Sequence, residues 1–269
     1  MKYATDELTN IRPSHGRVTL VGAGPGDPEL LTVKAIQAIK RATVLLVDDL
    51  VNPKILDHSP RSARIVHVGK RGGCISTPQS FIEKLMILAA KDGEEVIRLK
   101  GGDPFIFGRG GEEAANLRAA GITVEIINGI TSGLAASTAL GVPLTHRDKA
   151  HGVVFMTGHN RPDESATDWE ALGIAVKACK LTLVVYMGLA SIADIQSGLL
   201  ESLPSETPAA VIQHASLPHQ KSVTCTLSML SQTIRDNELH SPAIIVIGDV
   251  VAGAQAISQP HSLPAAIAA

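Results

Sequence analysis

The stretch RLKGGDPFIFGRGGEE occupies residues 98–113 and is the most distinctive part of the chain. It contains two glycine pairs, which remove side chains where a backbone turns sharply or approaches a ligand closely. Between the pairs lie one carboxylate, one arginine and an apolar trio: Asp103, Arg109, and Phe105, Ile106 and Phe107. Two of the four phenylalanines of the chain therefore lie in a segment that should be solvated. The concentration of aromatic side chains in this segment predicts the wall of a pocket rather than a simple turn.

Apolar runs typical of strands alternate with helical patterns on both sides of this stretch. Strands are expected at residues 17–21, 43–47, 65–68, 94–99, 122–127, 153–157, 181–186, 209–212, 221–225 and 243–247. Helices are expected at residues 29–41, 80–91, 112–120, 131–140, 168–177, 191–201 and 227–237. The alternation in the first half predicts a parallel sheet covered on both faces.

The pattern restarts in the second half, which predicts two α/β domains with a ligand cleft between them. We expect a mobile leader at 1–16, an N-terminal domain at 17–128, a linker and cleft segment at 129–149, a C-terminal domain at 150–257 and a mobile tail at 258–269.

Composition excludes several classes of function. The net charge of -2 argues against a nucleic-acid partner that is bound through a general basic field. Three cysteines without CxxC spacing predict neither a disulfide framework nor a metal site. No signal peptide and no long apolar span is present, so we expect a cytoplasmic protein without a membrane partner.

Two short motifs have more than one interpretation. Gly22-x-Gly24-x-Gly26 resembles a dinucleotide fingerprint, but Asp27 stands where glycine or alanine is needed and would repel a pyrophosphate. A tight strand-to-helix turn is the alternative. Asp48 follows a strand and could bind a ribose hydroxyl, transfer a proton or cap the next segment, and its spacing favours the cap.

Basic residues follow several of the predicted strands and turns. They are Lys70, Arg71, Arg98, Lys100, Arg109, His146, Arg147 and Lys149. In an open parallel sheet we expect them on one rim, where arginine forks suit carboxylates or phosphates. The set predicts a compact polyanionic ligand, whereas each lysine taken alone fits a solvated surface charge.

Five motifs in this order resemble the tetrapyrrole methylases, which use S-adenosylmethionine. They are VGAGPGDPELLT at residues 21–32, VGKRGG at 68–73, RLKGGDPFIFGRGGEE at 98–113, GITSG at 129–133 and GVPLTHR at 141–147. VGKRGG and PLTHR are most similar to the uroporphyrinogen-III C-methyltransferase branch. Asn128 departs from the family pattern, in which proline is usual at this position.

The resemblance implies two α/β domains, with a largely parallel N-terminal sheet and a mixed C-terminal sheet, and a homodimer. It places S-adenosylmethionine, whose product is S-adenosylhomocysteine, in the cleft against the Gly-Gly-Asp loop. The cofactor contacts that it implies are Pro25, Gly101, Gly102, Asp103, Ile106, Thr131, Ser132, Met187 and Ala215. Ala215 belongs to a His-Ala-Ser turn where related proteins often have Asn-Gly-Thr.

The implied reaction transfers two methyl groups to rings A and B of uroporphyrinogen III and gives precorrin-2. Catalytic candidates are Asp48 as proton acceptor, Lys70 as donor, and Arg109, Glu112 and Arg147 for anchoring before proton transfer. Substrate contacts are expected from Lys70, Arg71, Arg109, Glu112, His146, Arg147 and Met187. Two rivals are a methylase of a different corrin intermediate and a non-catalytic regulator with the same fold.

Overall fold

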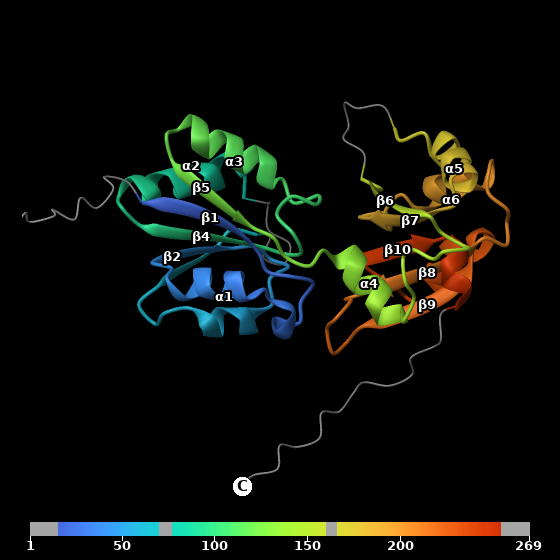
Figure 1. Cartoon of the computed structure of the whole chain (residues 1–269), viewed down its shortest axis with the longest axis horizontal. Helices are drawn as coiled ribbons and strands as arrows, with labels where there is room; N and C mark the ends of the chain where they lie inside the picture. The colour runs from blue at the N-terminus through green and yellow to red at the C-terminus, as the bar shows by residue number, and fades with distance from the viewer. Residues whose placement is uncertain (1–15, 70–76, 160–165, 254–269) are drawn as a thin grey trace, which may run out of the picture. The chain divides into compact units, whose positions relative to one another are not determined.

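The computed structural model describes residues 16–69, 77–159 and 166–253. It divides into two compact units (Figure 1). The first contains the chain up to Gly24 and from Pro28 to Ile130, and the second contains Pro25–Asp27 and the chain from Thr131 onward. The predicted tail and all but the last residue of the predicted leader lie outside the described residues. The predicted domain limits stay a prediction.

The first unit is built on a parallel sheet of five strands in the order β3-β2-β4-β1-β5. The strands are β1 (Arg17–Gly22), β2 (Val44–Val47), β3 (Arg64–His67), β4 (Glu95–Lys100) and β5 (Thr123–Ile127). The helices are η1 (Pro28–Leu30), α1 (Val33–Lys40), η2 (Pro53–His58), α2 (Gln79–Lys91) and α3 (Gly110–Ala119). The predicted parallel sheet is confirmed.

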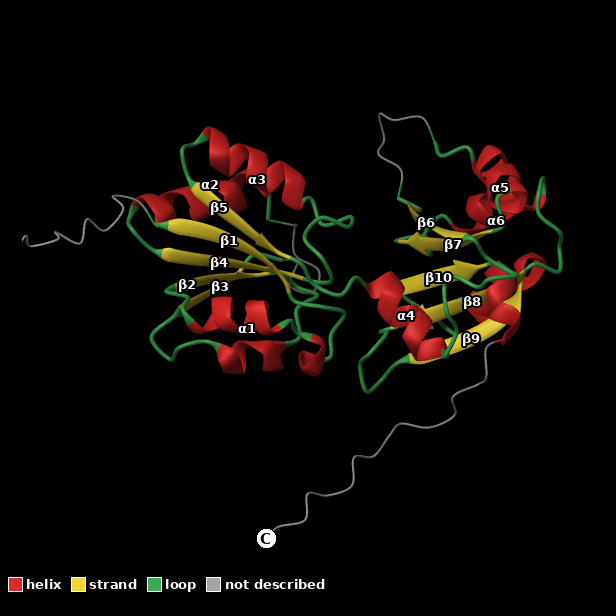
Figure 2. Cartoon of the chain, in the orientation of Figure 1, coloured by secondary structure: helices red, strands yellow, loops and turns green. Residues whose placement is uncertain are grey.

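Both faces of this sheet are buried. Figure 2 shows α1 on one face and α2 with α3 on the other. Ala35 and Ile39 of α1 pack with Leu45 and Ile97, while Met86 of α2 packs with strand residues of the opposite face. Successive strand residues point to opposite faces, so strands buried on both sides need nearly continuous apolar runs.

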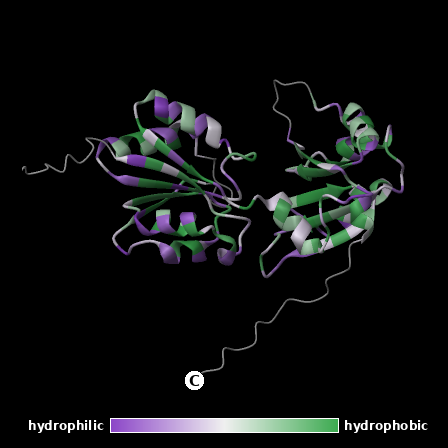
Figure 3. Cartoon of the chain, in the orientation of Figure 1, coloured by the Kyte–Doolittle hydropathy of each residue, from purple (hydrophilic) through white to green (hydrophobic). Residues whose placement is uncertain are grey.

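The second unit is built on a mixed sheet in the order β6-β7-β10-β8-β9, in which only β6 and β7 pair in parallel. Its strands are β6 (Gly152–Thr157), β7 (Leu181–Tyr186), β8 (Pro208–Gln213), β9 (Lys221–Thr226) and β10 (Ala243–Ile247). Its helices are α4 (Ser132–Leu140), α5 (Trp169–Ala178), α6 (Ile192–Leu200), η3 (Leu227–Met229), α7 (Leu230–Asp236) and η4 (Asp249–Gly253). Figure 3 shows that β7 and β10 are mostly hydrophobic.

The helices of the second unit cover two different faces of the mixed sheet. Trp169 of α5 and Leu199 of α6 share one core with Leu183 and Val185 of β7. A side chain at Gly133 of α4 would instead meet Tyr186 and Val184, which point to the opposite face. The predicted mixed sheet is therefore confirmed, with α4 on the face that α5 and α6 leave open.

Two helices differ most clearly from the sequence-based predictions. The helix predicted at residues 29–41 begins only at Val33, because the hydroxyl of Thr32 accepts a hydrogen bond from the amide of Ala35 and caps it. The 3-10 turn η1 precedes it. The helix predicted at residues 227–237 is divided into η3 and α7.

Three loops of the first unit meet at the carboxyl edge of the parallel sheet. A Cβ atom at Gly129 would lie 2.2 Å from the carbonyl oxygen of Gly102 and 2.8 Å from the Cα atom of Gly22. Gly24 and Gly102 exchange two backbone hydrogen bonds of 3.1 and 2.7 Å. The loops after β1, β4 and β5 therefore touch through their backbones, so the first glycine motif serves loop packing.

Gly129→Ala should lower the free energy of unfolding by about 1–3 kcal/mol, because the new methyl group meets backbone that cannot move aside. Gly111→Ala is the matched control, since a Cβ atom there meets nothing within 4 Å. Chemical denaturation of the two variants measures the difference. Equal stability of the Gly129→Ala variant and the wild type would contradict the close approach of the loops.

Candidate active site

Asp103 lies at the start of the loop after β4 and is only 6% exposed. Its Oδ1 atom accepts a hydrogen bond of 2.8 Å from the amide of Phe105. Its Oδ2 atom accepts bonds of 3.1 Å each from the side-chain amide of Asn128 and the backbone amide of Gly129. Asp103 thus ties the loop after β4 to the loop after β5, a role that its expected place beside the cofactor did not anticipate.

The apolar trio lies on the surface of the first unit. Phe105, Ile106 and Phe107 are 52%, 36% and 41% exposed. Phe107 has a positive φ of 51°, and Arg109 ends the loop with a φ of 58° at the start of α3. Left-handed backbone in two non-glycine residues indicates a loop whose shape is imposed by its contacts.

Arg109 and Glu112 form an ion pair on the exposed side of the first turn of α3. The Nη2 and Nε atoms of Arg109 lie 2.6 and 3.1 Å from Oε2 of Glu112. This hydrogen bond raises the pKa of Arg109 further above its ordinary value, against the opposing effect of burial. The guanidinium therefore stays charged, which favours anchoring of an anion over a role as base.

Arg98 and Lys100 differ from the prediction of solvated rim cations, because they are 2% and 4% exposed. Both bind Oε1 of Glu113, a fully buried carboxylate, at 3.4 and 3.1 Å. Buried charges need a partner, and α3 supplies it across the face of the sheet. Burial, followed by the charge of Arg98, lowers the pKa of Lys100.

Asp48 follows β2 and lies beside this buried cluster. Its Oδ2 atom is 3.5 Å from Nη2 of Arg98, and its side chain is 37% exposed. Its Oδ1 atom accepts a hydrogen bond from the amide of Asp49. Asp48 was expected to cap the segment that follows it, and its side chain accepts a hydrogen bond there from the amide of Asp49. Lys70 and Arg71 lie outside the described residues.

Three of the predicted cofactor residues of the second unit, Thr131, Ser132 and Met187, lie beside or directly after Tyr186 at the end of β7. The hydroxyl groups of Thr131 and Tyr186 lie 2.8 Å apart, and Tyr186 also accepts a bond from the amide of Gly133. Met187 comes next in the chain with a φ of 54° and is 50% exposed. Ser132 begins α4. The buried tyrosine thus fixes the start of α4 next to an exposed methionine.

Pro25 and Ala215 belong to two loops of the second unit that are hydrogen-bonded to each other. The hydroxyl of Ser216 accepts a bond of 3.1 Å from the amide of Asp27. Ala215 is buried, between two residues with positive φ, His214 and Ser216. The His-Ala-Ser turn therefore keeps a left-handed backbone without glycine.

His214 and His219 form a ring pair in the same loop. Their centroids are 4.4 Å apart. Burial, followed by the charge of His219, lowers the pKa of His214. The sequence places His214 in the His-Ala-Ser turn but does not predict its pairing with His219, because the pairing depends on the loop returning on itself after Ser216.

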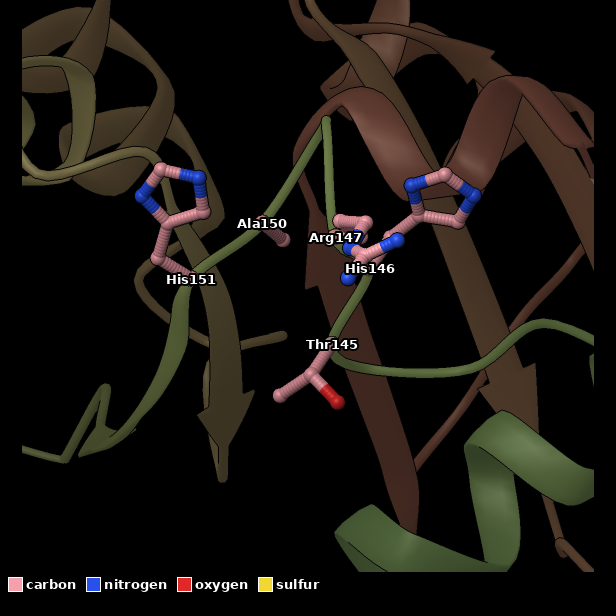
Figure 4. A pocket seen from close by; sticks show the side chains of 5 residues that line it. All are labelled: Thr145, His146, Arg147, Ala150 and His151. Carbon is pink, nitrogen blue, oxygen red and sulfur yellow. The ribbon is translucent and has the colours of Figure 1, made fainter.

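His146 and Arg147 line an open pocket of about 340 Å³ in the second unit. The backbones of His146 and Ala150 exchange two hydrogen bonds of 2.7 and 3.0 Å, which close the turn that carries Arg147. In the view of Figure 4, Arg147 lies between the imidazole rings of His146 and His151. His151 was missed in the sequence because it lies four residues beyond the PLTHR motif. The pocket offers cationic and neutral donors to an anion.

The described ranges of the chain are 16–69, 77–159 and 166–253. They contain no group of three or more histidine, cysteine or acidic side chains that could hold a metal ion. None of their helices has the length and apolar character needed to cross a bilayer.

The fold and the site define an α/β enzyme built from one parallel and one mixed sheet, with charged and glycine-rich loops after the strands. A family model for the tetrapyrrole (corrin/porphyrin) methylases matches residues 17–231. The chain belongs to this family, and the resemblance seen in its motifs is confirmed.

Similar proteins cover nearly the whole chain. A uroporphyrinogen-III C-methyltransferase of Pseudomonas aeruginosa is 54% identical over 251 residues, which are 93% of this chain and 99% of that protein. The crystal structure of a uroporphyrin-III C-methyltransferase from Thermus thermophilus complexed with S-adenosylhomocysteine is 38% identical, with a TM-score of 0.75, over 88% of this chain and 100% of that one. A cobalt precorrin-4 methyltransferase is 26% identical, with a TM-score of 0.77, over 87% and 95% of the two chains.

His219→Gln should raise the titration midpoint of His214 in an NMR titration, because it removes the imidazole charge that adds to the effect of burial. The rise is partial, since burial, the larger cause, is unchanged. His67→Gln, at an exposed histidine of β3, is the control and should leave the midpoint where it is. An unchanged midpoint in His219→Gln would contradict the ring contact.

The lowered pKa of His214 also determines the direction in which the stability of the protein changes with pH. Because the pKa of His214 is lowered in the folded protein, this residue contributes stability that is complete above about pH 6.5 and is lost as the pH falls through the folded-state value. His219→Gln should therefore reduce the loss of unfolding free energy on acidification.

Proposed function

We propose that the chain transfers two methyl groups from S-adenosylmethionine to pyrrole carbons of rings A and B of uroporphyrinogen III, giving precorrin-2 and S-adenosylhomocysteine. The observation that carries this proposal is the 54% identity over 93% of the chain to a uroporphyrinogen-III C-methyltransferase. The S-adenosylhomocysteine complex of the Thermus relative supports the choice of methyl donor.

The residues present fit a sulfonium cofactor with a nucleoside. Gly101 and Gly102 carry no side chains that would keep a ligand from the loop, Ile106 offers an apolar surface, and the start of α4 offers Thr131 and Ser132. Met187, Ala215 and Pro25 complete the proposed set. Asp103 acts mainly by holding the glycine loop, since both of its oxygens already accept hydrogen bonds. When bound, the cofactor supplies an electrophilic methyl group.

The substrate carries eight carboxylates, so the protein must bind it through fixed cations. Arg109 and Arg147 are exposed arginines, and the hydrogen bond with Glu112 orients the first of them. His146 lies beside Arg147 in the same turn. Lys70 and Arg71 are proposed partners on the basis of their motif alone. Arginine forks bind carboxylates with fixed geometry, which positions the pyrrole carbon for in-line attack.

A proton must leave the substrate after each methyl transfer. Asp48 is the proposed acceptor, because its carboxylate is partly exposed while its orientation is fixed by Arg98 and Asp49. Lys70 is the proposed donor. The remaining cellular assignments are also proposals: we infer a homodimer in the cytoplasm, with neither nucleic acid nor membrane as a partner, from the family resemblance and the net charge of -2.

A methylase of a different corrin intermediate is the second candidate, and the shared fold with a cobalt precorrin-4 methyltransferase favours it. A non-catalytic regulator is disfavoured by the presence of Asp48, Arg109, Glu112 and Arg147 together. The product is common to the routes to sirohaem, cobalamin and haem d1, so the proposal is independent of the choice among them.

Purified protein should convert uroporphyrinogen III, kept reduced, to a product with two added methyl groups and release two equivalents of S-adenosylhomocysteine. Mass spectrometry of the tetrapyrrole and chromatography of the nucleoside measure both. A single methylation, or turnover only with a later corrin intermediate, would favour the second candidate. Binding of the cofactor without turnover of any tetrapyrrole would favour the regulator.

Arg109→Ala and Arg147→Ala should each weaken tetrapyrrole binding about tenfold or more, because each removes charge-assisted hydrogen bonds to carboxylates. Binding of S-adenosylhomocysteine should change by less than about twofold. Calorimetry with each ligand separates the two effects, and Arg118→Ala, at an exposed arginine of α3, is the matched control. Loss of both ligands together would contradict the anchoring role.

A further inference from the structure

The guanidinium of Arg98 has a separate acceptor for each of its nitrogen atoms. Nε donates to Oε1 of Glu113 at 3.4 Å, Nη1 to the carbonyl of Leu99 at 3.2 Å, and Nη2 to Oδ2 of Asp48 at 3.5 Å. These acceptors come from α3, from β4 itself and from the segment after β2. A planar group held at three corners has little freedom to rotate.

Glu113 holds this guanidinium from a completely buried position. Its Oε1 atom accepts from Arg98, Lys100 and Gln79, whose amide lies at 2.8 Å. Its Oε2 atom has no hydrogen-bond partner among the described residues. Helical packing places Glu113 in the first turn of α3, where its amide bonds the carbonyl of Arg109. The carboxylate is thus fixed both by its helix and by three donors.

Asp48 is the partly exposed member among the four charged residues of the cluster, since Arg98, Lys100 and Glu113 are buried. Its backbone amide bonds the carbonyl of Leu99, which continues the sheet ladder one residue beyond β2. Arg98 then fixes one oxygen of the side chain and Asp49 the other. The charged groups of β4 that interact with it are Arg98 and Lys100, which both bind Glu113 of α3.

We infer that Arg98 and Glu113 are positioning residues for methyl transfer, in which Glu113 orients Arg98 and Arg98 orients the Asp48 carboxylate toward the reacting tetrapyrrole. This inference rests on the proposed function, because it takes Asp48 as the proton acceptor. It assigns to the arginine and glutamate of the long glycine motif a role distinct from the binding of either substrate.

A purely structural role makes a different prediction. If the cluster only stabilised the sheet, any change that weakened α3 by a similar amount would lower activity equally. If it positions Asp48, loss of the arginine fork should lower kcat while the KM values of both substrates stay nearly constant, and only while Asp48 can accept a proton. A double-mutant cycle with Asp48 separates the two roles.

The experiment uses Arg98→Lys, which keeps the charge but cannot bridge Glu113 and Asp48 at once, and Glu113→Gln, which keeps the volume. Each should lower kcat about 10- to 100-fold, as expected for a misplaced catalytic group. KM values should change by less than about twofold. Leu117→Val, at a fully buried position of α3, is the control for helix stability and should keep kcat. Thermal unfolding of each variant measures its loss of stability, so that losses of kcat can be compared between variants of similar stability.

In an Asp48→Asn background, Arg98→Lys should change the residual kcat by less than about twofold, because the group that it orients no longer accepts a proton. Glu113→Gln carries the same test if the lysine variant does not fold. Equal losses of kcat with and without Asp48, or a similar loss in Leu117→Val, would overturn the positioning role.

The wild type separates this inference from the proposed function. If it yields no doubly methylated product, the proposed function fails and the inference fails with it. If it yields that product while the cycle is additive, only the positioning role is overturned.

Discussion

The buried carboxylate of Asp103 holds the carboxyl edge of the parallel sheet together. A carboxylate that is 6% exposed has lost most of its water and must keep its protein donors. Those donors are the amides of Phe105 and Gly129 and the side chain of Asn128. Because they belong to two loops, the loops after β4 and β5 cannot move independently. The close backbone approach at Gly129 and Gly102 depends on this fixed geometry.

The charged residues near the carboxyl edge of the parallel sheet fall into a buried set and an exposed set. Inside the unit, Arg98 and Lys100 share the single carboxylate of Glu113, whereas Arg109 and Glu112 pair on the surface. Charges in the interior interact strongly with their neighbours, while exposed charges are screened by water and remain available to a ligand. One helix, α3, supplies the carboxylate of each set, because Glu112 and Glu113 follow each other in its first turn and only Glu113 is buried.

Strands were predicted to within one or two residues, because buried strands leave apolar runs such as VLLV at β2 and AIIVI at β10. The burial of Arg98 could not be predicted, because its partner is fifteen residues away and belongs to a helix whose first turn favours acidic residues anyway. Likewise, the pairing of His214 with His219 depends on a loop return that no local pattern encodes.

Asn128 shows how a departure from a family pattern acquires a physical meaning. The family pattern has proline at this position, where this chain has asparagine. In the structure the asparagine amide donates to Asp103, a bond that proline could not make. The bond gives Oδ2 of Asp103 a second donor beside the amide of Gly129. Asn128 therefore strengthens the connection between the loops after β4 and β5 and leaves the charge of this edge unchanged.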